Sequence, residues 1–563
     1  GDGVPRGGLS TQTNPLPAQI LACWQSVPYH PPETSSTLPE ALSFTTLRGA
    51  GGVDVQFTGT DNRDILLALN EGSTSIDALG GNDTIQLVNT TGVVGAVTAK
   101  GGAGNDTVTA LATAGGGVFA RLANASITAG PGRDTITSLG AVSSVLKGNE
   151  DADNFVLSGN YTNSTIAGNQ GEDSFTIGAA ITLEDTKIQG GNDNDGVMNF
   201  TLVNGAGAAI AAIADAVDST INGSKGVDQI NIGIVTASTN LFFHGGQGDD
   251  IITSTNATSN GITYSGDLGN DVLSITGNAS ATVNGGDGND VLVVNGTGNN
   301  SIDMGAGNDT YTDGAGRSTI AGGDGNDIAG DAAGNDTYDL GGGNDTASDG
   351  AGNDTYVLGV GNDTFTQAAG NGNDTITGGA GADTYNGAAG DGTDDFIFTA
   401  ISDSGAGGSV GGTAAAPTFV NSFDTFALNS INAGDEIDIT AVAQTLAGNT
   451  HNTADPLTGA GALTLVAGDI TDVATANTFG AIQTALANQL TPSTTGINSQ
   501  ISVDLVTVSA GRASGAYLIL NNSNSVLDSG DMMFEVGVAD LAVAADVATT
   551  ATTIVTAIEA GFA

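Results

Sequence analysis

A nine-residue repeat constrains the fold of this chain more than any other feature. Between residues 334 and 384 the pattern G-x-G-N-D-T, followed by an aromatic or aliphatic residue, recurs almost without change. Its aspartates are nine residues apart, except for one step of eleven: Asp336, Asp345, Asp354, Asp363, Asp374 and Asp383. A period of nine with glycine-rich turns is typical of a parallel β-roll, in which every turn joins two short strands.

The same glycine and aspartate pattern recurs more slowly from Thr58 onward. Most of its steps run from 18 to 23 residues, and the larger steps of 28 and 33 residues coincide with alanine- and glycine-rich insertions. One coil of a roll has two strands and two turns, so a step of twice nine returns to the same edge. The aspartates of this slower pattern are Asp64, Asp83, Asp106, Asp134, Asp153, Asp173, Asp195, Asp228, Asp250, Asp271, Asp290, Asp309 and Asp327.

We therefore expect one edge of the roll to carry the motif throughout and the opposite edge to carry it only from Asp327 to Asp383. In the earlier coils, metal-free turns such as 160–163 and 256–260 should close the opposite edge. Alternating apolar residues flank the motifs, and a period of two places one face inward. The eighth repeat position should point inward, and a threonine column should face solvent: Tyr338, Ala347, Tyr356, Phe365, Ile376 and Tyr385 inward, and Thr337, Thr355 and Thr375 outward.

The predicted fold is all-β, a long parallel β-roll or β-helix solenoid followed by a smaller β-rich C-terminal domain. Residues 1–45 are a proline-rich N-terminal arm, which either caps the solenoid or is a flexible leader, and residues 46–400 form the solenoid. Residues 401–417 are a glycine and serine linker. Residues 418–563 contain strand-like runs at 436–440, 501–508 and 517–520, a helical stretch near 478–489 and an aliphatic tail.

Charge and composition exclude several classes of function. The 61 acidic and 11 basic residues give a formal charge of -50, which excludes nucleic acid and anionic membranes as main partners, because both need a basic surface. Cys23 is the only cysteine, so no intrachain disulfide or thiolate zinc site is possible. The three histidines are scattered without an H-E-x-x-H motif, and His244 is expected to be a packing or turn residue.

No apolar run of membrane-spanning length occurs, and the N-terminus lacks the pattern of a secretory signal. We therefore expect no membrane insertion, and either a mature product or export without an N-terminal signal. A 39% hydrophobic content argues against general disorder, although without metal disorder becomes the favoured state of the repeats.

Stacked turns would bring their aspartates close together. Neighbouring parallel strands lie ~4.8 Å apart, and two like charges at that distance repel by about 1 kcal/mol in bulk water and several times more in a partly dry groove. Near neutral pH such a file of carboxylates takes up either protons or divalent cations, and cations are the easier route. Calcium fits best, because it accepts about six to eight oxygens in loose geometry, including backbone carbonyls that glycines leave accessible.

Several calcium ions are therefore expected, each between turns one coil apart on the same edge, such as Asp290 with Asp309 or Asp336 with Asp354. Degenerate motifs such as 148–153 could instead be solvated turns. The predicted metal-binding residues are Gly245, Gly248, Asp250, Gly266, Gly269, Asp271, Gly285, Asp287, Gly288, Asp290, Gly305, Gly307, Asp309, Gly322, Asp324, Gly325, Asp327, Gly334, Asp336, Gly341, Gly343, Asp345, Gly350, Gly352, Asp354, Gly359, Gly361, Asp363, Gly370, Gly372, Asp374, Gly379, Gly381 and Asp383.

The segments 285–293, 322–329 and 378–385 match the nonapeptide G-G-x-G-x-D-x-U-x, so the chain resembles the RTX family of secreted bacterial calcium-binding proteins. The resemblance covers about residues 245–395 strongly and 58–244 more weakly. It implies type I secretion through an uncleaved C-terminal signal, and folding outside the cell once calcium is available. RTX proteins usually carry an enzyme or toxin domain before the repeats, but here the repeats make up most of the chain, as in surface-layer and oscillin-like surface proteins.

The sequence favours a non-enzymatic, extracellular structural protein that folds on calcium binding and self-associates into a cell-surface layer, sheath or filament. An alternative is a secreted adhesin or matrix protein that binds cells, surface polysaccharide or lipopolysaccharide. A polysaccharide-modifying enzyme is a further alternative, because parallel β-helices host lyases; the single G-x-S-x-G match, at 407–411, lies in the linker without the strand-to-helix elbow that it needs. Ice or crystal binding through the threonine column is the last alternative.

Overall fold

The computed structural model describes residues 55–398, the strand Ser43–Arg48, and eight strands beyond residue 398. Gaps in the described part fall at 49–54, 70–72, 90–92, 95, 113–120, 196–197, 201, 204–208, 257–259, 278, 368–371 and 388–391. The chain divides into two compact units, residues 1–41 and 42–563, and every described residue belongs to the second. Most of the predicted N-terminal arm and the helical stretch predicted near 478–489 lie outside the described residues.

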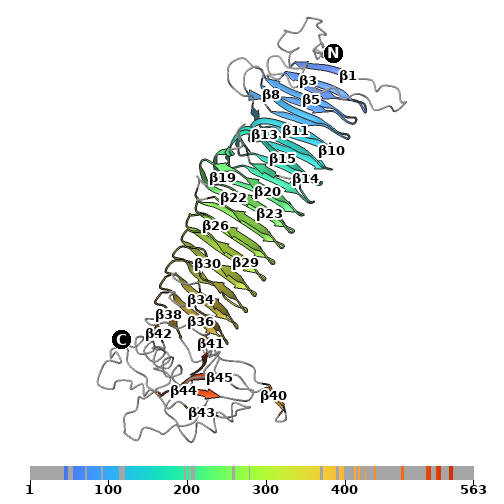
Figure 1. Ribbon diagram of the computed structural model, residues 1–563. Helices are drawn as coiled ribbons and strands as arrows, with labels where there is room; N and C mark the ends of the chain where they lie inside the picture. The colour runs from blue at the N-terminus through green and yellow to red at the C-terminus, as the bar shows by residue number, and fades with distance from the viewer. Residues whose placement is uncertain are drawn as a thin grey trace, which may run out of the picture. The chain divides into compact units, whose positions relative to one another are not determined.

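Two parallel ladders of strands form the solenoid (Figure 1). Each strand pairs with the strand one coil further on, so the chain returns to the same face after every coil. Ladder A contains β1 (Ser43–Arg48), β3 (Asp64–Leu69), β5 (Thr84–Asn89), β8 (Thr107–Ala112), β11 (Thr135–Val142), β13 (Asn154–Thr162), β15 (Ser174–Glu184), β17 (Met198–Phe200), β20 (Gln229–Ile232), β23 (Ile251–Ser254), β25 (Val272–Ile275), β27 (Val291–Val294), β29 (Thr310–Asp313), β31 (Ile328–Gly330), β33 (Thr346–Ser348), β35 (Thr364–Thr366), β37 (Thr384–Asn386) and β41 (Thr425–Phe426).

Ladder B alternates with ladder A along the chain. The turns that lead from ladder B into ladder A form the first edge of the solenoid, and the turns that lead from ladder A into ladder B form the second edge. Ladder B contains β2 (Val55–Thr58), β4 (Thr74–Asp77), β7 (Val97–Lys100), β10 (Ser126–Pro131), β12 (Val145–Glu150), β14 (Thr165–Asn169), β16 (Lys187–Gly191), β19 (Ala209–Lys225), β22 (Ser238–Gln247), β24 (Ile262–Leu268), β26 (Ala281–Asp287), β28 (Asn300–Ala306), β30 (Ser318–Asp324), β32 (Thr337–Asp339), β34 (Thr355–Val360), β36 (Thr375–Ala380), β38 (Asp395–Ile397) and β42 (Glu436–Asp438).

The earlier coils have a third, short parallel side, which corrects one prediction. Residues 160–163 were predicted to be a metal-free turn, but Asn160, Tyr161 and Thr162 continue strand β13 after a break in register between Leu157 and Gly159. The extra side runs through β6 (Val93–Val94), β9 (Arg121–Ala123), the later parts of β11, β13 and β15, part of β19, and β21 (Ile234–Val235). It accounts for the longer coils in this region. The other predicted turn, 256–260, lies partly outside the described residues.

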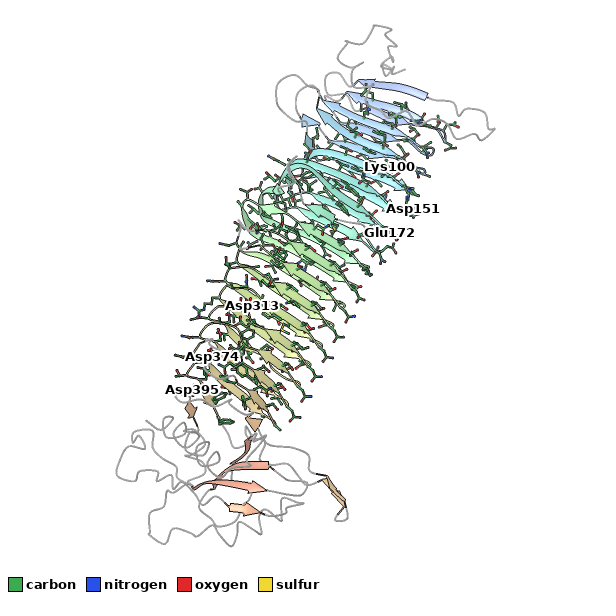
Figure 2. All side chains as sticks on the ribbon, viewed as in Figure 1. Lys100, Asp151, Glu172, Asp313, Asp374 and Asp395 are labelled. Atoms are coloured by element: carbon green, nitrogen blue, oxygen red, sulfur yellow. The ribbon has the colours of Figure 1, made fainter. Side chains whose placement is uncertain are left out.

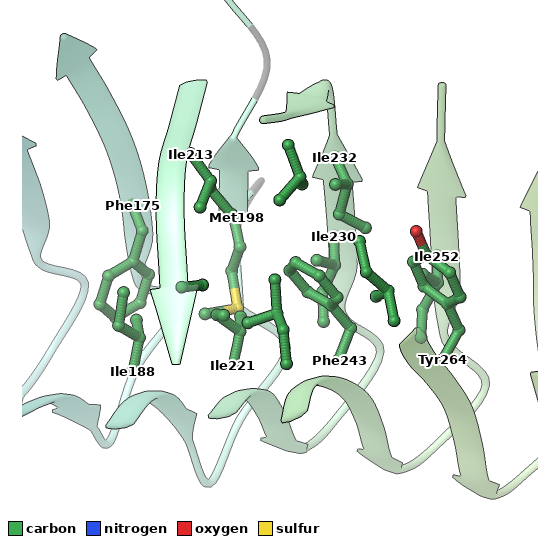
Figure 3. Packing of buried hydrophobic residues seen from close by; sticks show 14 of the residues in the cluster. Phe175, Ile188, Met198, Ile213, Ile221, Ile230, Ile232, Phe243, Ile252 and Tyr264 are labelled. Carbon is green, nitrogen blue, oxygen red and sulfur yellow. The ribbon is translucent and has the colours of Figure 1, made fainter. Parts of the chain in front are cut away.

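The core is a continuous stack of inward side chains (Figure 3). In strand β26, Val283 is fully buried while its neighbour Thr282 is exposed, as the period of two predicts. Aromatic rings stack along the axis, with centroids 4.7 Å apart for Phe155 and Phe175. The prediction for the eighth repeat position is confirmed, because all six of its side chains are at most 1% exposed: Tyr338, Ala347, Tyr356, Phe365, Ile376 and Tyr385. The threonines Thr337, Thr355 and Thr375 form the predicted column, half-buried rather than fully exposed.

Beyond residue 398 the ladders continue through β41 and β42, which pair in parallel with β37 and β38. Strand β46 (Met532–Val536) pairs with β41 and, antiparallel, with β45 (Gly515–Asn521), which pairs with β44 (Ser502–Val508). β43 (Thr471–Val473) lies parallel to β44, and β39 (Gly411–Thr413) forms a hairpin with β40 (Ala416–Thr418). The strands predicted near 436, 501 and 517 are therefore present. The remaining small strand, β18 (Leu202–Val203), pairs antiparallel with β19.

Candidate metal centre

The first edge carries an unbroken file of buried aspartates. Each aspartate lies at or just before the start of a ladder A strand. From Asp83 onward, its Oδ1 accepts a hydrogen bond from the backbone N–H of the aspartate one coil earlier, at 2.6–3.1 Å. All sixteen members are at most 4% exposed: Asp64, Asp83, Asp106, Asp134, Asp153, Asp173, Asp195, Asp228, Asp250, Asp271, Asp290, Asp309, Asp327, Asp345, Asp363 and Asp383.

The second oxygen of most of these carboxylates has no donor, whereas Asp64 Oδ2 accepts the amide of Thr60 at 2.7 Å. From Asp83 to Asp363, every Oδ2 in the file is buried and accepts no hydrogen bond. In the coil of Asp290, this oxygen lies 2.6 Å from the point that a Cβ on Gly285 would occupy, so glycine leaves the space around it open. A buried oxygen with a formal charge and no donor is costly unless a cation compensates it. The free oxygens fit calcium, which takes carboxylate ligands in flexible geometry.

The glycines of the first edge have conformations that other residues rarely adopt. Gly286 has φ 115° and Gly288 has φ 145°, both in the left-handed region. A Cβ on Gly288 would also collide with the carbonyl oxygen of Gly269, one coil earlier. The sequence G-G-x-G-x-D therefore folds into a turn whose backbone carbonyls pack closely against the next turn.

Burial raises the pKa of the carboxyls from Asp83 to Asp363, and in many of them like charges one coil away raise it further. The pKa reaches about 7 for Asp309 and about 8 for Asp250. It reaches about 9 for Asp195, whose neighbours Asp228 and Asp173 both add to the effect. The hydrogen bond from the preceding amide opposes the shift but does not cancel it. Without a cation, the carboxyls of Asp195 and Asp250 in the folded first edge therefore favour the protonated form near neutral pH.

Basic side chains compensate little of the file: Arg63 lowers the pKa of Asp83, but burial outweighs it and the net shift is upward. The one ion pair in the described part of the chain joins His244 Nδ1 to Asp267 Oδ2, at 3.0 Å, on the outer side of ladder B. Burial raises the pKa of Asp267, but hydrogen bonds from His244 and Ser265 outweigh it, and the net shift is downward. His244 also stacks on Phe242, so the prediction that it packs rather than binds metal is consistent with its contacts.

The second edge changes character along the solenoid. Its late coils carry the same arrangement, with Asp354 Oδ1 accepting the amide of Asp336 at 2.6 Å and Asp374 Oδ1 accepting the amide of Asp354 at 2.8 Å. In early coils neutral side chains hold this position, because Ser144 Oγ accepts the amide of Ala125 at 3.0 Å. In register the column reads Ser144, Ser164, Thr186, Ser219, Leu241, Ile262, Ala281, Asn300, Ser318, Asp336, Asp354, Asp374 and Asp394.

An asparagine ladder lies beside the carboxylates, and its hydrogen bonds run between the coils in the opposite direction. Asn308 N–H donates to Asn289 Oδ1 at 2.7 Å, so here the side chain of the earlier coil accepts from the later coil. The same bond links Asn326 to Asn308 and Asn344 to Asn326. Adjacent coils are thus tied in both directions by the N-D pair of the motif.

The structure places most of the predicted metal-binding residues together. The aspartate neighbours expected one coil apart, such as Asp290 with Asp309 and Asp336 with Asp354, are hydrogen-bonded partners. Asp153, in a degenerate motif, is 2% exposed, so the solvated-turn alternative is wrong for it. Two predicted ligands differ from the rest, because Asp287 and Asp324 are exposed and lie outside the buried file.

Two groups of residues at this centre were missed from the sequence. The neutral column of the second edge escapes notice because serine or threonine before a strand is common, although its spacing follows that of the aspartates. The acidic residues Asp313, Asp331 and Asp349 were missed because they stand five residues before the motif aspartate or its equivalent, where the motif has glycine. The structure groups them with Asp336 and Asp354, and Asp313 is labelled in Figure 2.

Comparison with known families agrees with this geometry. Residues 92–112, 275–311, 303–329, 332–365 and 368–394 match the family described as RTX calcium-binding nonapeptide repeat (4 copies). This chain carries RTX repeats. RTX repeats bind calcium and are typical of secreted proteins. Neither the curated proteins nor the solved structures gave a match to the chain.

Proposed function

We propose that this RTX chain is an extracellular structural protein that folds when it binds calcium after export and then assembles into a cell-surface layer, sheath or filament. The observation that carries the proposal is the run of fourteen buried aspartates from Asp83 to Asp363, whose second oxygens lack donors. Bound calcium would supply positive charge and accept those oxygens as ligands. From Asp83 onward, each aspartate accepts a hydrogen bond from the amide of the previous coil. Because a cation removes the repulsion between neighbouring carboxylates, it stabilises the contact between coils.

Calcium-linked folding would act as a switch at export. A ligand that binds only the folded state stabilises it by RT ln(1 + [L]/Kd) at each site, and many equivalent sites make the response steep. Where calcium is scarce, the repelling carboxylates oppose folding. Where calcium is plentiful, the same carboxylates hold the coils together. In the described residues no helix is both long and apolar enough to cross a membrane.

The outer surface of ladder A supports assembly of several chains rather than a monomer. Ile251, Val272 and Val291 are in register one coil apart and each is about two-fifths exposed. Ile328, two coils further on, is 51% exposed and continues the column. An outward apolar stripe on a regular face is typical of a surface that meets another protein, and the repeat presents the same contact in successive coils.

We also propose that the chain has no catalytic role. The enzyme alternative needs a pair of carboxylates with different environments as acid and base. Here the motif carboxylates of each edge share one environment, and even the late Asp394 accepts the amide of Asp374 at 2.9 Å like the rest of its column. Of the G-x-S-x-G match at 407–411, only Gly411, the first residue of β39, lies within the described residues.

Calcium titration of the purified full chain tests the proposal. Starting in chelator at pH 7, circular dichroism should show a cooperative gain of β-structure as calcium is added, and electron microscopy of the same samples should show ordered sheets or filaments. Magnesium at equal concentration should give a much weaker response. A chelated protein that keeps its full β-signal and binds no calcium would overturn the proposal. Folding with calcium but without ordered particles would remove the assembly part and favour the adhesin alternative.

A further inference from the structure

Carboxylates enter the interior of the solenoid at one column of the second edge. This column stands five residues before the motif aspartate, and its side chains point inward. Asp313, at the end of β29, is 1% exposed, Asp349 is 6% exposed, and Asp331 lies between them in the 18-residue repeat. The equivalent position of the first edge holds either glycine, as at Gly285 and Gly322, or a fully buried apolar side chain, as at Met304, Leu340 and Leu358. Acidic residues therefore replace core residues here.

These carboxylates form two overlapping triads with the motif aspartates. One triad is Asp313, Asp331 and Asp336, and the other is Asp331, Asp349 and Asp354. Within each triad the three ligand oxygens lie within 4.8 Å of one another. No hydrogen-bond donor reaches either oxygen of Asp331, or the Oδ2 atoms of Asp313, Asp336 and Asp354. The two triads thus share one carboxylate, and four of their five carboxylates present oxygens that no donor reaches.

A buried tyrosine provides a second, independent sign that something is bound here. Tyr338 is fully buried and its hydroxyl has no partner. Its ring stacks on that of Tyr356 at 4.7 Å and 10°, so the two hydroxyls point the same way. The Tyr356 hydroxyl donates to Asp349, seven residues earlier, at 3.1 Å. By the repeat, the Tyr338 hydroxyl is directed at the group that contains Asp331.

The next coil shows how the same space is filled by a neutral donor. There Gln367 takes the place of Asp331 and Asp349 in the column. Its Nε2 donates to Asp374 Oδ2 at 3.0 Å and to Asp394 Oδ2 at 2.9 Å. The amide thus joins the two motif carboxylates that would otherwise face one another. Where the column holds Asp331, no such donor is present, and the Oδ2 atoms of Asp336 and Asp354 accept no hydrogen bond.

The sequence around this cluster is poor in positive charge, and Arg317, the basic residue nearest to it in the sequence, is exposed. From residue 318 to residue 398 the sequence contains no lysine, arginine or histidine. A shared proton can join one pair of carboxylates, but each triad contains three. Five clustered carboxylates carry five negative charges, and two divalent cations would supply four positive ones. Oxygen-only ligands in this number suit calcium better than zinc or copper.

We propose that the two triads are inner calcium sites, distinct from the glycine-turn sites of the repeats, and that Asp331 is the ligand they share. The proposal rests on the proposed calcium-dependent folding, and it adds sites built from side chains inside the coil. These sites lie at the point along the chain where the second edge changes from neutral side chains to carboxylates.

The test replaces Asp331 with glutamine, which copies the arrangement of Gln367. The matched control is Asp339→Asn, an exposed carboxylate eight residues away on the outer face. Full-length proteins are compared by calcium stoichiometry in equilibrium dialysis, and by terbium luminescence excited through tyrosine, since Tyr338 and Tyr356 lie beside the cluster. Asp331→Gln should lose two calcium ions per chain and most of the tyrosine-sensitised terbium signal that this cluster gives, while Asp339→Asn should match the unchanged protein.

Circular dichroism in calcium checks that the variants fold. If Asp331→Gln fails to fold, Asp331→Leu copies Leu340 of the first edge and is measured in the same way. Unchanged stoichiometry in the folded variant would overturn the inner sites and identify the cluster as carboxyls that share protons. That result leaves the proposed calcium-dependent folding intact. The folding proposal is overturned only if the unchanged protein itself binds no calcium.

Discussion

At the scale of the residue, the motif aspartate has two oxygens with different roles. In Asp309, Oδ1 accepts the amide of Asp290 at 2.7 Å, which any residue with a carbonyl oxygen at that place could do. Its Oδ2 accepts nothing from the protein. The first oxygen belongs to the fold and the second is available to a cation, so the two roles can be separated by mutation.

Asp309→Asn is expected to keep the amide bond and remove the charge. In excess calcium the variant should be less stable by about 1–3 kcal/mol, since a ligand is weakened. In chelator the effect should reverse, because a buried like charge between Asp290 and Asp327 is gone. The calcium midpoint of the circular dichroism transition measures both effects. The control is Asp303→Asn, an exposed carboxylate on ladder B; an equal shift there would contradict the assignment.

Gly288→Ala is expected to destabilise the repeats by about 1–3 kcal/mol, because φ 145° is strained for alanine and its Cβ would meet the carbonyl of Gly269. Gly330→Ala is the matched control, since its Cβ would lie 3.7 Å from the nearest atom, the Tyr311 carbonyl oxygen. Thermal unfolding in calcium should separate the two variants. Equal melting temperatures would show that the turn tolerates a side chain.

At the scale of the element, each edge is a column of side chains between two ladders. Whether these side chains are charged or neutral decides whether the edge needs a cation to hold its coils together. The first edge is acidic throughout, whereas the second is neutral up to Ser318 and acidic from Asp336. Serine or asparagine at the same position makes the same bond to the previous amide without charge. Where the column has such a side chain, as at Ser144, Ser219 and Asn300, the second edge therefore holds its coils together without a cation, and the acidic columns do not.

The acidic columns predict an unusual pH dependence in chelator. The folded pKa values, from about 6 for Asp83 to about 9 for Asp195, exceed the ordinary value of about 4. A raised folded pKa contributes stability that is complete below the unfolded pKa and is lost as pH rises through the folded values. The chelated protein should therefore gain β-structure when acidified from pH 9 to pH 4. Circular dichroism at fixed chelator and ionic strength measures this; a β-signal that falls on acidification would contradict it.

At the scale of the whole solenoid, the file joins coils that are far apart in sequence. From Asp64 to Asp383 there are fifteen hydrogen-bonded steps, which at ~4.8 Å each span about 70 Å. Since every coil contacts only its neighbours, stability is a sum of local terms, and a cation at each step acts on all of them. Loss of calcium should therefore affect the whole file rather than one local site.

Small-angle X-ray scattering should detect this change. In calcium the chain should give a rod-like profile consistent with a folded file about 70 Å long. In chelator at pH 7 the radius of gyration should rise as the repeats expand, and returning calcium should reverse it. The same experiment with magnesium is the control. A radius of gyration that does not change with calcium would show that the coils hold together without metal.

The sequence predicted the fold and most of the aspartate positions because a short period repeats the same turn residues and the same apolar alternation in every coil. Glycine before aspartate and alternating apolar residues around it leave few structures other than a parallel roll. The sequence did not reveal the third side near Tyr161 or the inward position of Asp331. Both depend on which residues lie one coil away, and the coil length varies from 18 to 33 residues in this chain.

By itself the sequence determined the glycine turns, the aspartates of both edges and the inward aromatic column, since these follow from local spacing alone. Only the tertiary structure decided which oxygens are left without donors, where neutral side chains replace carboxylates, and that Asp313, Asp331 and Asp349 point into the core. The reason is physical: burial and hydrogen bonding belong to pairs of coils, and the register between coils is set by packing across the solenoid rather than by any one repeat.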